Sequence, residues 1–274
     1  MAAAAFGPVA AVASATDGTV AGVPVRVYVP VAEGPLPVVV HFHGGGYVFG
    51  DLDTHDGVAR ELAARTPAVV VAVDYRLAPE HPFPAAVADS WAVVAHVREH
   101  AAGWGGDPDR VAVGGDSAGG GLAAVAALRA RDAGLPLRLQ FLVYPVADHN
   151  PERASMREYS KGYGLTASAM DWYVEQYLPA AADRSSPEAF PLLADSLAGV
   201  AEAHVVTVEF DPVRDSGEAY AQRLRDAGVR VTQIREPGLV HGSYRMPGLI
   251  PEARRILDGV VTALRRTLHD ERPA

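Results

Sequence analysis

The chain alternates short apolar runs with longer segments whose apolar residues repeat at helical spacing. The runs that predict strands cover residues 23–29, 37–42, 69–73, 110–113, 137–143, 205–208 and 229–234. The central runs are continuously apolar, which is typical of strands covered on both faces. Strand-like character begins near Val9, and the start of the chain is interpreted as a frayed segment leading into an edge strand.

Helical spacing is clearest where apolar residues fall on one face, at Val87, Trp91 and Val94 and again at Ile256, Val260, Leu264 and Leu268. Two further predicted helices end at Gly134 and Gly228, because glycine tolerates the left-handed conformation that closes a helix. The alternation of strands and helices predicts an α/β fold with a mostly parallel central sheet and helices on both faces. The length of 274 residues fits a single domain, residues 1–274.

Composition narrows the classes of partner and chemistry. The net charge of −9 and a single lysine, Lys161, argue against nucleic-acid and anionic-membrane partners. The absence of cysteine excludes disulfides, cysteine-ligated zinc and a cysteine nucleophile. No apolar run approaches the length of a membrane span. Residues 13–15 resemble a signal-peptide cleavage site, but no Lys or Arg precedes Arg26, so the sequence predicts a cytoplasmic protein.

The most informative motif surrounds Ser117, within Gly-Asp-Ser-Ala-Gly at residues 115–119. It follows an apolar strand and opens an alanine-rich helical stretch. A sharp strand-to-helix turn needs small flanking residues and holds the serine hydroxyl above the sheet, next to a helix N-terminus that favours negative charge. A glycine-rich turn without chemistry is the alternative interpretation of this motif taken alone.

Other motifs change that balance. His43-Gly44-Gly45-Gly46 follows a buried strand, where consecutive backbone N–H groups can stabilise an oxyanion. Asp211 follows the strand at residues 205–208, and His241 lies in a loop after the strand at residues 229–234. The order Ser, Asp, His, each just past a strand end, is the chain order of an α/β-hydrolase.

Together these motifs resemble the hormone-sensitive-lipase-like family of carboxylesterases. The resemblance runs from about Val23 to the C-terminal helix and includes residues 74–85, Asp-Tyr-Arg-Leu-Ala-Pro-Glu-His-Pro-Phe-Pro-Ala, which resemble a long family signature. It implies an α/β-hydrolase fold with a cap over the site and hydrolysis of short- to medium-chain acyl esters, a small-molecule substrate, without a cofactor.

The resemblance also implies a role for each motif residue. Ser117 would be the nucleophile, His241 the general base and acid, and Asp211 the carboxylate that orients the histidine. The oxyanion hole would consist of the N–H groups of Gly44, Gly45 and Ala118, and His43 would support the oxyanion loop by hydrogen bonding. Two positions depart from the family pattern, because Ser216 replaces an acidic residue and Ser243 an aromatic one.

The segment at about residues 148–195 has no clear strand and is rich in tyrosine, methionine and tryptophan. By resemblance it is interpreted as a cap-like insertion, the alternative being a peripheral helix pair whose aromatic residues belong to the core. The cap helices that usually precede the first strands of this family are missing from the sequence pattern. We therefore expect a reduced cap, and either an unusually open pocket or one covered by a neighbouring subunit in a homodimer.

Several residues compete for the predicted roles. Asp215 is the nearest rival to Asp211, although Asp215 and Glu218 also form a helix capping-box pattern. Glu209 shares a strand face with Asp211 and stays an alternative acid, while Asp116 is interpreted as local support beside the nucleophile. The remaining histidines are interpreted as structural or solvated: His55, His81, His96, His100, His149, His204 and His269.

Other chemistries fit the sequence less well. His41-Phe42-His43 resembles the start of a metallo-β-lactamase zinc motif but lacks the Asp-His that follows, and the acidic residues 51–56 are interpreted as a solvated loop entering a helix. The glycine-rich runs lack Gly-Lys-Ser/Thr, so no metal or nucleotide is expected. An amidase or lactonase with the same triad stays an alternative, as does a non-catalytic small-molecule receptor.

Overall fold

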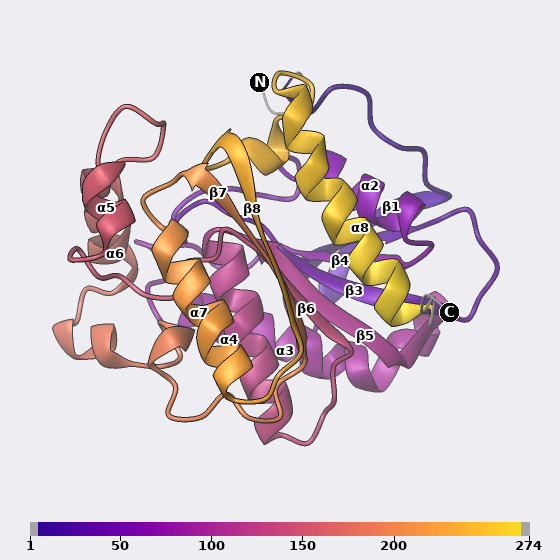
Figure 1. Ribbon diagram of the computed structural model, residues 1–274. Coiled ribbons are helices and arrows are strands. Elements are labelled where there is room, and N and C mark those ends of the chain that lie inside the picture. Colours follow the sequence, from indigo (N-terminus) through magenta and orange to yellow (C-terminus); the bar gives the residue numbers. More distant parts are fainter. Residues whose placement is uncertain (1–4, 270–274) are drawn as a thin grey trace.

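The computed structural model describes residues 5–269 and contains an eight-stranded sheet with the strand order β1-β2-β4-β3-β5-β6-β7-β8 (Figure 1). The strands are β1 Ser14–Val20, β2 Val23–Val29, β3 Leu36–Phe42, β4 Val69–Val73, β5 Gly106–Asp116, β6 Leu139–Val143, β7 Glu202–Phe210 and β8 Val231–Val240. β1 and β2 are antiparallel to their neighbours, and the strands from β4 to β8 pair in parallel. The predicted α/β fold with a mostly parallel sheet is confirmed.

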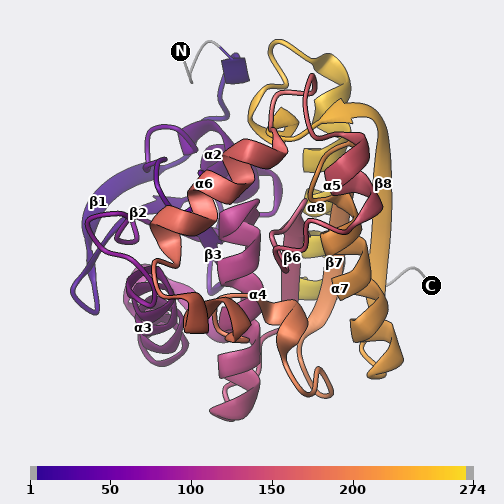
Figure 2. The ribbon, with the colours of Figure 1, turned by 90° about the vertical axis from the view of Figure 1, so that its left-hand side faces the viewer.

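The helices lie on both faces of the sheet (Figures 1 and 2). They are α2 Asp56–Arg65, α3 Ala85–His100, α4 Ala118–Asp132, α5 Ala154–Glu158, α6 Ala167–Tyr177, α7 Arg214–Asp226 and α8 Arg254–Leu268, with short 3₁₀ turns η1 Ala101–Trp104, η2 Ala181–Ser185, η3 Pro191–Leu193, η4 Ser243–Arg245 and η5 Pro251–Ala253. Helices α3, α4 and α7 cover one face, and α2 and α8 cover the other. None of the helices described is long and apolar enough to cross a membrane.

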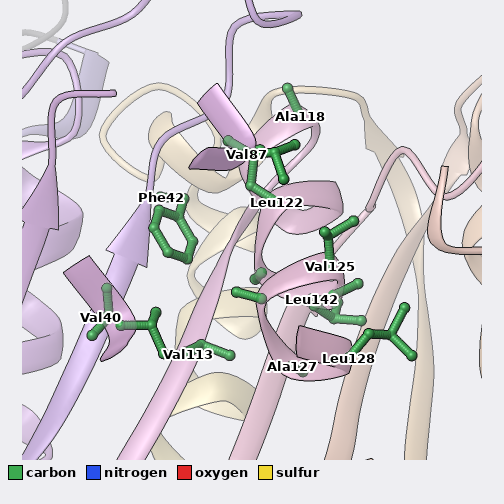
Figure 3. Close-up of a cluster of buried hydrophobic side chains, with 14 of the residues drawn as sticks. Val40, Phe42, Val87, Val113, Ala118, Leu122, Val125, Ala127, Leu128 and Leu142 are labelled. Atoms are coloured by element: carbon green, nitrogen blue, oxygen red, sulfur yellow. The ribbon is translucent and has the colours of Figure 1, made fainter. Parts of the chain in front are cut away.

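The core follows from the two-residue period of the strands. Along β3, Val38 and Val40 pack into the cluster that contains α3 and α4, whereas Val39 packs with residues of α2 and α8. Figure 3 shows Val40 near Val113 of β5 on the side of the sheet where Leu122 of α4 lies. This two-sided burial fixes the strand register, and with it the positions where the strands end.

The outermost strands differ most from the sequence predictions. The edge strand begins at Ser14 rather than near Val9, and its register with β2 follows from a tight turn at Ala21 and Gly22, both with positive φ. At the other edge, β8 continues to Val240, beyond the predicted end at residue 234 and through Pro237. An edge strand tolerates proline because one side of its backbone has no ladder partner. His241 therefore follows a strand end directly.

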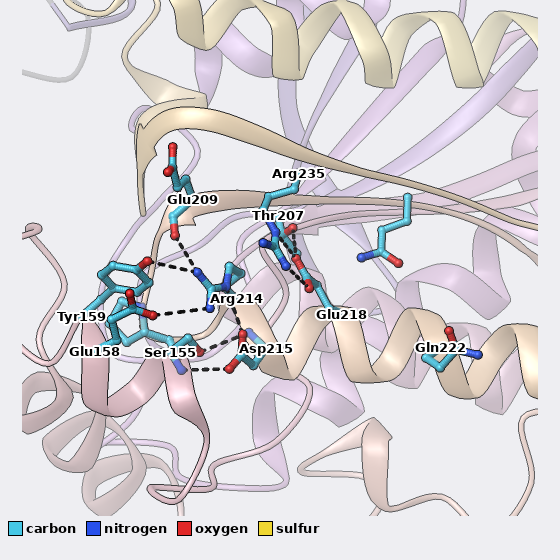
Figure 4. A network of polar contacts seen from close by, with 12 residues as sticks. Ser155, Glu158, Tyr159, Thr207, Glu209, Arg214, Asp215, Glu218, Gln222 and Arg235 are labelled. Atoms are coloured by element: carbon cyan, nitrogen blue, oxygen red, sulfur yellow. Dashed lines mark hydrogen bonds and ion pairs between the residues drawn. The ribbon is translucent and has the colours of Figure 1, made fainter.

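The segment at residues 148–195 contains α5, α6, η2 and η3, and no strand is found in it. Figure 4 shows how α5 is held against α7. Ser155 donates its backbone N–H to the Asp215 carboxylate at 2.8 Å, and Arg214 donates to the Tyr159 hydroxyl at 3.2 Å. These contacts fix the start of the segment beside the loop that carries Asp211.

The predicted capping box at Asp215 and Glu218 is wrong. α7 begins at Arg214 and its N-cap is Val213, so Asp215 lies inside the first helical turn. Glu218 instead accepts hydrogen bonds from Thr207 and Arg235 (Figure 4). The two helix ends predicted at Gly134 and Gly228 are confirmed, with φ of +67° and +79° just past α4 and α7.

Candidate active site

Ser117 lies in the sharp turn between β5 and α4 with φ of +57° and ψ of −120°, a strained conformation for a residue with a side chain. The neighbouring glycines permit close approach to β3. A Cβ on Gly115 would lie 2.2 Å from the carbonyl oxygen of Phe42, and one on Gly119 would lie 2.1 Å from the same atom. The turn therefore holds Ser117 at the carboxyl edge of the sheet, at the N-terminus of α4.

The three residues predicted to form a triad lie together. His241 Nε2 is 2.8 Å from Ser117 Oγ, and His241 Nδ1 is 2.8 Å from Asp211 Oδ2. Asp211 is fully buried, and its second oxygen accepts the N–H of Val213 at 2.9 Å. Asp211 follows β7 and His241 follows β8, so adjacent parallel strands bring the two side chains into contact.

The rival acids lie elsewhere. Glu209 accepts the backbone N–H of Gly238 at 2.7 Å, which ties β7 to β8. Asp215 accepts hydrogen bonds from Ser155 and Arg214 on the α5 side of α7. Neither carboxylate has a recorded contact with His241, so the geometry favours Asp211 as its partner.

One predicted oxyanion donor is wrong. The N–H of Gly44 is donated to Asp116 Oδ1 at 3.1 Å and lies 3.3 Å from His55 Nε2. This N–H is therefore occupied, and Gly44 is not among the residues that line the pocket. Gly45 and Gly46 do line the pocket, next to Ser117.

His43 stabilises the glycine loop through a hydrogen bond to its backbone. Its Nδ1 lies 2.9 Å from the carbonyl oxygen of Gly44, and since a carbonyl only accepts, Nδ1 carries the hydrogen. The Tyr75 ring stacks on His43 at 4.3 Å, and its hydroxyl donates to the His43 carbonyl at 2.7 Å. Burial, with His55 nearby, lowers the pKa of His43 to about 4, so this ring is neutral at pH 7.

Asp116 connects the serine turn to the glycine loop. Besides the bond from Gly44, its Oδ1 lies 3.1 Å from His55 Nε2, and both side chains are buried. Burial alone would raise the pKa of Asp116, but the charge and hydrogen bond of His55 outweigh it and hold that pKa well below its usual range. The sequence marked Asp116 as local support and His55 as structural or solvated. It did not show that they meet.

The pocket in front of Ser117 has a volume of about 570 Å³, including the part that is open to solvent, and a mainly apolar wall. Leu165, Met170, Tyr173 and Val174 come from the segment at residues 148–195, and the rest of the wall comprises Gly45, Gly46, Tyr47, Phe49, Asp116, Val146, His241, Gly242 and Arg245. Ser243 and Tyr244, which follow Gly242, are buried and do not line the pocket. Arg245 lines the pocket, although no motif indicated it.

Ser216 and Ser243, the two departures from the family pattern, have local roles. Ser216 Oγ accepts the backbone N–H of Asp148 at 2.9 Å, which anchors the loop after β6. Ser243 Oγ donates to the carbonyl of Val240 at 2.7 Å and closes the turn that carries His241. Within residues 5–269, no group of three or more His, Asp or Glu side chains is arranged to hold a metal ion.

Comparisons with known proteins agree with this geometry. A family model described as the alpha/beta hydrolase fold matches residues 39–245. The chain is 45% identical over 254 residues to the carboxylesterase NlhH of Mycobacterium tuberculosis, covering 90% of this chain and 79% of that protein. It is 40% identical over 251 residues to an ethyl acetate hydrolase of Pseudomonas putida, covering 89% of this chain and 79% of that protein.

Among solved structures, the carboxylesterase EstE1 from a metagenomic library superimposes with a TM-score of 0.91 at 40% identity, covering 96% of this chain and 91% of that one. The likeness therefore extends over both the sheet and the segments around the candidate site. Given this match in sequence and in structure, the chain belongs to the hormone-sensitive-lipase-like family of α/β-hydrolases and is a carboxylic ester hydrolase.

Proposed function

We propose that this protein is a serine carboxylesterase that cleaves short- to medium-chain acyl esters through Ser117, His241 and Asp211. The observation that carries the proposal is the continuous chain of contacts at 2.8 Å from Ser117 Oγ through the His241 ring to Asp211. It opens onto a mainly apolar pocket, which suits an ester with few polar groups.

In the first half of the reaction, His241 Nε2 takes the proton of Ser117 as Oγ attacks the ester carbonyl carbon. The resulting tetrahedral oxyanion collapses, the bond to the alcohol oxygen breaks, and His241 returns the proton to the leaving alcohol. Water, deprotonated by the same ring, then releases the acid from Ser117. Asp211 holds the tautomer with a hydrogen on Nδ1 and stabilises the imidazolium.

We propose that the N–H groups of Gly45, Gly46 and Ala118 bind the oxyanion. Gly46 thus replaces Gly44 in the set that the sequence predicted. Ala118 is the first residue of α4, where N–H groups have no partner within the helix. Gly45 and Gly46 line the pocket with φ of +135° and +63°, in a loop whose preceding N–H is fixed on Asp116. Each such donor typically contributes about 3–4 kcal/mol to transition-state stabilisation.

We propose that residues at about 148–195 form the cap. Met170 and Tyr173 of α6 face the pocket, while Phe49 and Trp172 near its rim are each about half exposed, at 47% and 49%. A cap this small closes over a short acyl chain more readily than over a long one. The relative named an ethyl acetate hydrolase supports a preference for short chains. Association into a homodimer and a cytoplasmic location stay predictions.

The test is hydrolysis of p-nitrophenyl esters from acetate to palmitate by wild type and by Ser117→Ala. We expect wild type to prefer the short chains and Ser117→Ala to lose nearly all turnover while keeping its circular dichroism spectrum. Ser90→Ala is the matched control, since it removes another buried serine hydroxyl, one that donates to the Ala86 carbonyl within α3. Turnover by Ser117→Ala comparable to wild type would end the proposal.

A further inference from the structure

Arg245 places a positive charge in the wall of an otherwise mainly apolar pocket. It ends η4, the turn that begins two residues after His241, and its backbone N–H donates to the carbonyl of Gly242 at 3.3 Å. The side chain is partly buried and lines the pocket together with Ser117 and His241. Its location therefore depends on the same turn that positions the candidate base.

The guanidinium of Arg245 has no hydrogen bond or ion pair with any part of the chain that the structure describes, and its Nε is buried without a partner. Other partly buried arginines of this chain do have partners. Arg153 pairs with Asp148, and Arg214 with Asp215. A buried guanidinium donor without an acceptor is costly, and the acceptors that suit its planar fork are carboxylates and phosphates.

The charges around the pocket restrict where such an acceptor can lie. Asp116 also lines the pocket, but its Oδ1 is engaged by Gly44 and His55 and does not contact Arg245 within hydrogen-bond distance. The positive charge of Arg245 nevertheless helps to lower the pKa of Asp116, which places the two groups within electrostatic range. Because Asp116 repels anions and Arg245 attracts them, an acidic ligand group would be most stable in direct contact with Arg245.

The position of Arg245 also indicates which part of the substrate it meets. In the proposed reaction His241 Nε2 gives its proton to the leaving alcohol, so the alcohol portion lies on the histidine side of Ser117. Arg245 belongs to the turn that follows His241 and lines the same pocket, so we infer that it meets the alcohol portion.

We propose that Arg245 binds a carboxylate on the alcohol portion of the ester, so that the enzyme favours esters whose leaving alcohol carries a carboxylate. This inference rests on the proposed esterase function. The alternative is that Arg245 serves only as a buried counter-charge for Asp116, in which case its loss would affect neutral and anionic substrates alike.

The experiment compares para- and meta-acetoxybenzoate with the matched acetoxybenzamides, which have the same shape without the charge. For each enzyme, the value of kcat/KM for the acid is divided by the value for the matching amide. The ring position, para or meta, that gives the larger ratio for wild type is used for the comparison. Dividing this ratio for wild type by the ratio for Arg245→Gln removes the intrinsic reactivity of each ester. We expect the quotient to be roughly 10 to 100, from the typical strength of charge-assisted hydrogen bonds.

The change should fall mainly on KM, because the carboxylate binds Arg245 equally in the ground and transition states. Arg245→Lys keeps the charge without the fork and should give an intermediate quotient. Arg230→Gln is the matched control, since it removes the same charge from a 75% exposed side chain just before β8 and should give a quotient near one.

A quotient within about twofold of one for Arg245→Gln, with p-nitrophenyl acetate still cleaved, would overturn the role of Arg245 and leave the esterase proposal standing. Equal losses on acid and amide would assign Arg245 to the counter-charge role and would also overturn it. Failure of wild type to cleave p-nitrophenyl acetate would instead contradict the proposed function itself.

Discussion

Lowering the pH from 7 to 5 is expected to destabilise this protein, because three buried histidines stay neutral in the fold. Burial, together with His55, lowers the pKa of His41 to about 3 and that of His43 to about 4. Burial, together with Arg266, lowers the pKa of His204 to about 4. Unfolded histidine binds its proton near pH 6.5, so the stabilisation is complete above that pH and is lost as the pH falls toward 4.

The magnitude follows from the difference between these pKa values. A histidine that titrates near 6.5 when unfolded and at or below about 4 when folded loses about 1.9 kcal/mol of stability between pH 7 and pH 5. The three together lose roughly 5–6 kcal/mol, a large share of the ~5–15 kcal/mol that stabilises a typical protein. Asp116 does not oppose this loss, because its depressed pKa contributes stability that is present above pH ~4 and lost only below it.

The assay is urea unfolding at pH 7, 6 and 5, followed by circular dichroism. His204→Leu should reduce the loss between pH 7 and 5 by about a third, since it removes one of the three groups. This histidine belongs to β7 with its ring next to Gly259 of α8, and both of its ring nitrogens are unpartnered within residues 5–269. His100→Leu, at a half-exposed side chain, controls for the substitution itself. A free energy of unfolding that changes by less than about 1 kcal/mol from pH 7 to 5 would refute the reasoning.

Two substitutions test the oxyanion loop, with p-nitrophenyl acetate kinetics as the measurement. Asp116→Asn removes the charge that holds Gly44 and His55, and we expect kcat to fall roughly tenfold or more with a smaller change in KM; an unchanged kcat would contradict a positioning role. Gly46→Ala would bring a Cβ within 2.5 Å of the Tyr173 ring at a positive φ, and we expect kcat/KM to fall roughly 100-fold. Gly162→Ala carries a similar backbone strain at φ of +93° in open space, and an equal loss there would show that the effect is not local.

The central strands were predictable from the sequence because they are buried on both faces and therefore consist of continuous apolar runs. The start of the edge strand β1 was not predicted correctly, because most of its residues are exposed and polar and its position depends on the turn at Ala21 and Gly22. The end of β8 was not predicted, because a proline such as Pro237 usually interrupts a strand. It is tolerated there since β8 lies at the edge of the sheet.

The positions of the residues around Ser117 could be predicted from the sequence where a strand end determines them. Asp211 and His241 each follow a strand, and parallel neighbours bring them together whatever the loops do. The direction of an individual N–H group could not be predicted in the same way, since it depends on the path of the loop. Nothing in the run of three glycines shows that Asp116 accepts from the first of them. The location of Arg245 in the pocket wall was likewise not predictable from the sequence, because it depends on the turn after His241.

Asp116 and Arg245 are best understood as a pair of opposite charges that line the same pocket. In the proposed site, Asp116 fixes the N–H of Gly44, and the N–H groups of the next two glycines, which line the pocket, would bind the oxyanion. The same buried negative charge disfavours a substrate anion anywhere in the pocket except at Arg245, where an opposite charge without a protein partner in the described residues is available. One carboxylate would thus support the oxyanion loop and limit the orientations of an acidic ester. We therefore expect wild type to cleave para- and meta-acetoxybenzoate with different kcat/KM values, because only one ring position can place the carboxylate at Arg245. Asp116→Asn should bring these two kcat/KM values closer together as well as slow turnover.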